Sequence, residues 1–109
     1  MMKKFVFLAK YTKQGTDGWL ENPDEDRRAM INSLAKKLGG ELIDLVYTRG
    51  EYDVIALLTA PDADVCLSLK MAMLKTGAIA ELSIQEEIDL GSIARKGSEM
   101  IGLYKAPGN

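Results

Sequence analysis

The side chains best suited to chemistry gather beside one predicted turn. Tyr52 and Asp53 directly follow the segment Arg49-Gly50-Glu51. A tyrosine hydroxyl can donate a hydrogen bond there, and a neighbouring carboxylate can act as a base. The same residues also have a structural interpretation, in which Gly50 shapes the turn, Tyr52 packs at the end of a sheet and Asp53 accepts backbone hydrogen bonds. We favour the structural interpretation, and no catalytic residue is assigned.

A second polar group lies where the first predicted strand ends, at Tyr11, Gln14 and Gly15. Together with other tyrosines, it could surround a pocket that is apolar inside and carries a few polar groups. The alternative is that the tyrosine rings pack and leave their hydroxyls in water. The candidate ligand-binding residues are Tyr11, Gln14, Gly15, Tyr47, Tyr52 and Asp53.

The sequence contains no histidine and one cysteine, Cys66. Without histidine there is no Ser-His-Asp or Cys-His nucleophile and no histidine-ligated haem, zinc or iron. A single cysteine excludes a cysteine-cluster metal site. Cys66 lies in an apolar helical stretch, so we expect it to be buried. We expect no metal and no cofactor.

The charge is small and evenly spread, with a formal net charge of −2. No concentrated Lys/Arg patch of the kind that binds nucleic acid is present, so we expect no nucleic-acid partner. No apolar stretch reaches the length of about 20 residues that spans a membrane, so we expect no membrane partner. The apolar run after Lys4 is too short for a signal peptide, which makes the cytoplasm the expected location.

Periodicity and turn residues predict a single domain over residues 1–109, with a core at 4–87 and a C-terminal helix and tail at 88–109. The strands are predicted at 4–12, 41–48, 52–59 and 78–87. Residues 13–18 are predicted to form a loop because they contain two glycines.

The first helix is expected to have Asn22 as its cap and Pro23 at its first position, and to end before Gly39. A second helix opens at Pro61-Asp62, and a third covers about 90–101. The order β-α-β-β-α-β with an extra C-terminal helix predicts an α+β, ferredoxin-like sandwich.

Both predicted central strands are apolar on both faces. The first strand has Val6 and Leu8 on the side away from its phenylalanines. The third strand has Ile55 and Leu57 together on one of its two sides. An exposed apolar sheet face usually marks an interaction surface. We therefore expect a homodimer that pairs through the sheet as a dimeric α/β barrel, with Val6, Leu8, Ile55 and Leu57 as interface candidates. The alternative is that the C-terminal helix folds over its own sheet.

Several short motifs resemble those of the GYD-domain family over roughly residues 4–85. They are Tyr11-Thr12-x-Gln14-Gly15, Gly39-Gly40, Gly50-Glu51-Tyr52-Asp53 and Pro61-Asp62. The resemblance implies a dimeric α/β-barrel type of fold and little about chemistry, because the family's function is largely unassigned. Two features depart from the family pattern: three acidic residues separate Pro23 from Arg27, and the preceding loop carries Trp19.

These observations predict a homo-oligomeric small-molecule-binding or regulatory module. The expected partners are a second copy of the chain and a small-molecule ligand. One alternative is a cofactor-free enzyme of the dimeric α/β-barrel kind, a monooxygenase or isomerase, with Tyr52 and Asp53 handling protons. Another is a protein–protein assembly module.

Overall fold

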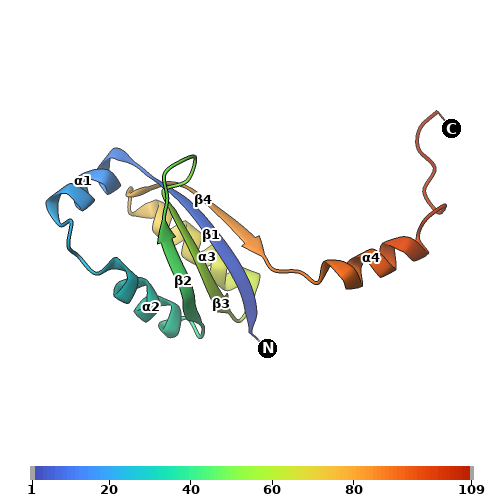
Figure 1. The fold of residues 1–109 in the computed structure, drawn as a ribbon, viewed down its shortest axis with the longest axis horizontal. Coiled ribbons are helices and arrows are strands. Elements are labelled where there is room, and N and C mark those ends of the chain that lie inside the picture. The colour runs from blue at the N-terminus through green and yellow to red at the C-terminus, as the bar shows by residue number, and fades with distance from the viewer. Residues whose placement is uncertain (1, 109) are drawn as a thin grey trace.

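The computed structural model describes residues 2–108 and contains a four-stranded antiparallel sheet (Figure 1). The strands are β1 (Lys3–Tyr11), β2 (Glu41–Tyr47), β3 (Val54–Ala60) and β4 (Ile79–Glu86). The helices are α1 (Lys13–Glu21), α2 (Arg27–Lys37), α3 (Ala63–Lys75) and α4 (Leu90–Glu99). The sheet order β2-β3-β1-β4 places the first and third strands in the centre. The prediction of an α+β, ferredoxin-like fold is confirmed.

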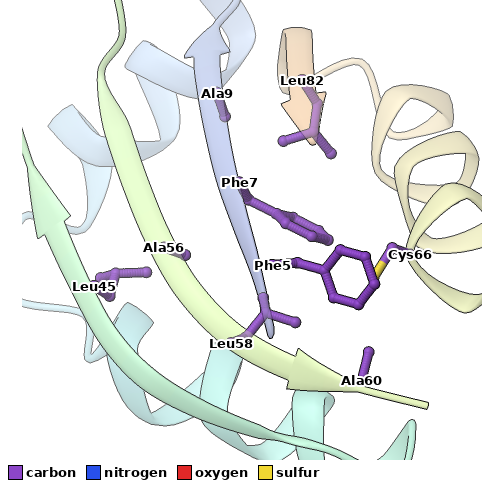
Figure 2. Packing of buried hydrophobic residues seen from close by; sticks show 9 residues of the cluster. All are labelled: Phe5, Phe7, Ala9, Leu45, Ala56, Leu58, Ala60, Cys66 and Leu82. Carbon is purple, nitrogen blue, oxygen red and sulfur yellow. The ribbon is translucent and has the colours of Figure 1, made fainter. Parts of the chain in front are cut away.

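Alternation along the central strands separates a buried face from an open one. Phe5, Phe7 and Ala9 of β1 are buried on the face that α2 and α3 cover. Figure 2 shows the rings of Phe5 and Phe7 pointing toward Cys66 of α3. Phe5 is 1% and Cys66 2% exposed, which confirms the predicted burial of the thiol. Full burial of a phenylalanine stabilises the fold by roughly 1.5–3 kcal/mol.

The predicted loop at 13–18 is wrong, because this segment belongs to α1. Thr12 caps the helix, with its Oγ1 accepting a hydrogen bond from the Gly15 amide at 3.2 Å. Lys13 and Asp17, one helical turn apart, form an ion pair at 2.7 Å. A Cβ on Gly15 would lie 2.4 Å from the carbonyl oxygen of Ala78. The glycine therefore allows the helix to approach the start of β4, instead of breaking it.

The predicted start of the next helix at Asn22 and Pro23 is also wrong. Asn22 closes α1, where its amide donates to the carbonyl of Gly18. Pro23 lies in the turn that follows. The cap of α2 is Asp26, whose carboxylate accepts a hydrogen bond from the Ala29 amide at 3.0 Å. The extra upstream helix takes Asn22 as its own C-terminal cap, which moves the start of α2 to Arg27.

The remaining boundaries lie within about two residues of the predicted ones. Asp62 caps α3 by accepting from the Val65 amide at 2.9 Å. Gly39 follows the end of α2 with a φ of 92°, a conformation that favours glycine. The connection between β2 and β3 runs over residues 48–53, longer than the predicted turn, and Gly50 has a φ of 147° within it.

The helix α4 forms where it was predicted but does not cover its own sheet. Asp89 caps it through the Ser92 amide at 3.1 Å. The helix projects away from the sheet beyond the end of β4 (Figure 1). The radius of gyration is accordingly 18.1 Å, with extents of 60 × 35 × 23 Å. A compact chain of this length would have a radius of about 13 Å.

Candidate functional site

A cavity lies between the sheet and its two covering helices. Because α2 packs against β2 and α3 against β4, the middle of the sheet is left between them. The cavity there has a volume of about 280 Å³. Its floor includes Ala9, Ala56 and Ala60, which are buried and too small to fill the space above the central strands. The cavity thus follows from the placement of alanine at positions where larger side chains would close the core.

The polar groups of the cavity lie at one end of the sheet. The strands β1 and β2 both run antiparallel to β3, so their last residues, Tyr11 and Tyr47, lie at the same end. Arg27, the first residue of α2, also lines the cavity. Toward the other end the lining is apolar except for Thr59, and it includes Leu58 and Cys66. We refer to Tyr11, Arg27 and Tyr47 as the polar end.

The helix α1 helps to hold Tyr47 in place. The ring of Trp19 meets the ring of Tyr47 edge to face, with 5.1 Å between centroids and an interplanar angle of 81°. Partial removal from water is the main cause that raises the pKa of Tyr47 above its ordinary value, and the electrostatic interaction with Tyr11 raises it further. At neutral pH the Tyr47 phenol is therefore protonated and can donate a hydrogen bond.

The two arginines at the start of α2 make different contacts. Arg28 donates to the Asp44 carboxylate at 2.8 Å and to the Leu45 carbonyl at 3.3 Å, which ties α2 to β2. The Arg28 hydrogen bond holds the pKa of Asp44 below its usual range. Among residues 2–108, the ion pair that Arg27 makes is a loose one with Glu25, at 3.7 Å. Arg27 is the cationic residue in the cavity lining.

Four of the six predicted ligand-binding residues lie at or beside the cavity. Tyr11 and Tyr47 line it. Gln14 and Gly15 lie in a neighbouring, more open hollow of about 670 Å³ under α1, which they share with Tyr11. The Gln14 amide donates to the Thr76 carbonyl at 3.1 Å, so this side chain joins α1 to the end of α3.

Tyr52 and Asp53 do not line the cavity. The Asp53 carboxylate accepts a hydrogen bond from the Tyr11 amide at 2.8 Å, and the Asp53 amide donates to the Ala9 carbonyl at 2.9 Å. The Tyr52 ring lies 5.3 Å from the Lys10 ammonium. The hydrogen bond to Glu81 is the main cause that raises the pKa of Lys10. These contacts favour the structural interpretation of the pair.

Two features of the cavity were absent from the set predicted from the sequence. Arg27 was not in that set, and the three acidic residues directly before it gave no local sign of a cationic site. The alanine floor was also missed, since Ala9 and Ala56 are ordinary strand residues in sequence. Only the paired positions of β1, β3 and β2 in the sheet bring Phe7, Ala56 and Leu45 into one row.

The opposite face of the sheet carries an apolar stripe, defined here as Val6, Leu8, Ile55 and Leu57. In the sheet, Val6 pairs with Leu57 and Leu8 with Ile55, so the four side chains form one patch. All four are half-buried within the chain. Toward β4 the same face is polar, with Glu81, Ser83 and Gln85 beside β1.

The described residues contain neither a metal-binding cluster nor a membrane-spanning helix. Across residues 2–108, no group of three or more His, Cys, Asp or Glu side chains is arranged to hold a metal ion. None of the helices in this same range is both long and apolar enough to cross a membrane.

The sheet order, the two covering helices and the apolar cavity between them define a ferredoxin-like α+β protein with space for a small ligand. The family model of the GYD domain matches residues 5–89. The chain therefore belongs to the GYD-domain family, as its motifs predicted. No curated protein and no solved structure matched the sequence.

Proposed function

We propose that this protein is a homodimeric small-molecule-binding module, with a regulatory or carrier role, and that its ligand occupies the cavity between the sheet and α2 and α3. The observation that carries the proposal is an apolar cavity of about 280 Å³ with an arginine at its polar end. Ligand sites are typically apolar concavities with a few well-placed polar groups.

The lining suggests the chemical class of the ligand. An apolar cavity of roughly 150 Å³ is enough to bind benzene. The larger volume here suits an aromatic or short aliphatic body. Arg27 can form a charge-assisted hydrogen bond with a carboxylate, and the Tyr11 and Tyr47 phenols can donate to it. We therefore expect a small apolar carboxylic acid.

The enzyme alternative has less support. Its proton-handling residues, Tyr52 and Asp53, lie outside the cavity, and the Asp53 carboxylate is engaged by the Tyr11 amide. The titratable groups at the polar end are two tyrosines and an arginine. A protonated phenol and a guanidinium are suited to binding an anion, and neither acts as a base at neutral pH.

The homodimer is supported by the apolar stripe on the open sheet face. An antiparallel sheet that met only water on this face would alternate apolar and polar residues along its strands. Here β1 and β3 carry apolar residues on both faces. Association of two copies by a two-fold axis would cover the same patch on each chain.

The ligand proposal is tested with a thermal-shift and NMR titration against benzoate, phenylacetate and hexanoate, with benzyl alcohol as an uncharged comparison. We expect saturable binding of at least one acid, weaker by roughly 10-fold in Arg27→Gln, which corresponds to about 1.4 kcal/mol. Ala56→Leu should block binding by filling the floor. Ala72→Leu, on the exposed side of α3, is the matched control and should bind normally.

Two results would contradict the ligand proposal. If none of the acids shifts the melting temperature or the resonances of cavity residues, the cavity does not select this class. If a bound acid is unaffected by Ala56→Leu in a variant that melts cooperatively, the ligand lies elsewhere.

A further inference from the structure

The C-terminal arm, defined as residues 88–104, has an apolar face that is exposed to solvent. In α4 and the turn that follows, the apolar and small residues recur at spacings of three and four, which places them on one side of a helix. Leu90 is 67%, Ile93 48% and Ile101 82% exposed. The opposite side of α4 carries Arg95 and Glu99. Such a face normally belongs against another apolar surface.

The exposed surface of the whole chain is too large for a compact subunit. The chain exposes 7925 Å². A compact monomer of 12.0 kDa would expose about 6,000 Å². The excess is therefore roughly 1,900 Å² per chain. A standard interface buries about 800 Å² on each partner, and obligate homodimers bury more. The excess is of the size that an obligate dimer interface covers.

The link between β4 and α4 directs the arm away from its own sheet. It consists of Glu87, Ile88 and Asp89, with neither glycine nor proline to favour a tight reversal. The Glu87 amide donates to the Lys4 carbonyl at 2.9 Å, which continues the β1–β4 pairing. Asp89 then caps α4. Neither of these contacts turns the arm back toward its own sheet, and α4 projects beyond the end of β4 (Figure 1). A short hinge of this kind favours exchange between two copies.

We propose that the C-terminal arm crosses to a second copy of this chain and packs its apolar face on that copy's apolar stripe. This inference rests on the homodimer of the proposed function and names the part of the second copy that covers the sheet. A ten-residue helix is about 15 Å long, enough to span the two central strands, which lie about 4.8 Å apart. Small residues at Ala94 and Gly97 let the helix approach the sheet closely.

A second copy fits the arm better than a membrane surface does. Interfacial membrane helices are usually rich in Lys and Arg on the polar face. The polar face of α4 has Arg95 and Lys96, partly offset by Glu99. Reciprocal exchange about a two-fold axis would cover both arms and both stripes at once, and would leave a closed assembly.

A disulfide test distinguishes exchange from self-covering. The full-length double variant Ile93→Cys/Ile55→Cys places one thiol on the arm and one on the stripe, while the native Cys66 is buried. Under mild oxidation we expect a covalent dimer at twice the 12.0 kDa chain mass on a non-reducing gel. The single variants and the wild type serve as controls. A disulfide within one chain overturns the proposal, and so does the absence of any disulfide in a chain that sediments as a dimer.

Matched point variants measure the same contact without cross-linking. Ile93→Asp puts a charge on the apolar face, and Ser92→Asp puts the same charge on the opposite face of α4. By sedimentation we expect Ile93→Asp to weaken dimerisation at least about 100-fold and Ser92→Asp to change it less than about 3-fold. Both variants should keep the circular dichroism of the wild type, since α4 lies outside the core.

The same variants separate failure of this inference from failure of the homodimer. If Ile93→Asp dimerises like the wild type while a charge on the stripe abolishes the dimer, the sheets pair directly and only the exchange is wrong. If the wild-type chain is monomeric at tens of micromolar, the homodimer and the exchange both fail. Binding of monomeric chain to vesicles of anionic phospholipid would assign the arm to a membrane surface and overturn the exchange.

Discussion

At the scale of single residues, Asp53 has a side chain that could act as a base but instead accepts a hydrogen bond from the backbone. The Tyr11 amide is the last in β1, next to the irregularity where the β1–β4 register shifts between Lys10 and Tyr11. The Asp53 carboxylate satisfies this amide from the neighbouring loop. Buried or half-buried donors that lose their partner are costly, so a carboxylate here stabilises the end of the strand.

Replacing Asp53 by alanine should destabilise the fold by about 2 kcal/mol, since hydrogen bonds to charged groups contribute roughly 1.5–3 kcal/mol. Urea unfolding followed by circular dichroism measures the change. Asp17→Ala, which removes only an exposed helical ion pair with Lys13, should cost less than about 0.5 kcal/mol. An Asp53→Ala chain as stable as the wild type would contradict the structural interpretation.

Cys66 should behave as a buried, unreactive thiol. It is 2% exposed, and removal from water raises its pKa. Because the folded-state pKa lies above the unfolded value of about 8.5, the protonated thiol favours the folded state below that pH. This contribution is lost as the pH rises through the folded-state pKa.

We therefore expect Ellman's reagent to modify native Cys66 at pH 8 at least about 100-fold more slowly than the chain in 8 M urea. The stability advantage of the wild type over Cys66→Ala should narrow between pH 8 and pH 10, as measured by urea unfolding. A native modification rate equal to the unfolded rate would show that the thiol is accessible.

At the scale of elements, α1 depends on one glycine for packing and tolerates another. A Cβ on Gly15 would lie 2.4 Å from the Ala78 carbonyl oxygen and 2.8 Å from Tyr11 Cδ1. A Cβ on Gly18 would meet nothing within 4 Å. The two glycines occupy the same short helix, so they form a matched pair.

Gly15→Ala should destabilise the fold by about 2 kcal/mol or more, because the backbone of α1 or of β4 must shift. Gly18→Ala should instead stabilise it by about 0.5–1 kcal/mol through helix propensity. Thermal unfolding monitored by circular dichroism compares the two. Equal effects of the same sign would mean that α1 does not pack against the start of β4.

Sequence patterns identified most elements here, and the misses have physical causes. The strands and α3 were predictable because apolar alternation and the Pro61-Asp62 cap are local signals. The helix α1 was missed because its two glycines suggested a loop, while its stabilising contacts, such as Gln14 to the Thr76 carbonyl, come from elsewhere in the chain. Tyr11 and Tyr47 were predictable as residues of the cavity lining, since both end strands. The cavity itself depends on the spacing of two helices and on alanines that come from β1 and β3, two strands far apart in the sequence, which no local pattern records.

At the scale of the whole molecule, the two faces of the sheet differ in what covers them. The covered face combines a packed region around Phe5 with a cavity above its alanines. The open face carries the half-buried apolar stripe, and the arm leaves Leu90, Ile93 and Ile101 exposed. A ligand in the cavity and a second copy on the open face would act on the same two central strands. Each binding event is expected to stabilise the folded chain, and so to raise its melting temperature, by mass action.

The apolar stripe gives the most direct test of the proposed homodimer. Leu57→Lys places a charge at the centre of the stripe, beside Val6. Gln85→Lys places the same side chain at the polar, exposed edge of the same face. By light scattering at tens of micromolar, we expect the wild type and Gln85→Lys to be dimers and Leu57→Lys to be a monomer.

Because dimerisation is linked to folding by mass action, the melting temperature of the wild type should also rise with protein concentration. That of Leu57→Lys should be lower and independent of concentration. A Leu57→Lys chain that remains a dimer would place the interface away from the stripe. A wild-type melting temperature that does not change over a 100-fold concentration range would argue against linkage between the dimer and the fold. Because residues of one chain line the cavity, a monomeric Leu57→Lys protein should still bind the ligand, so the two proposals can fail separately.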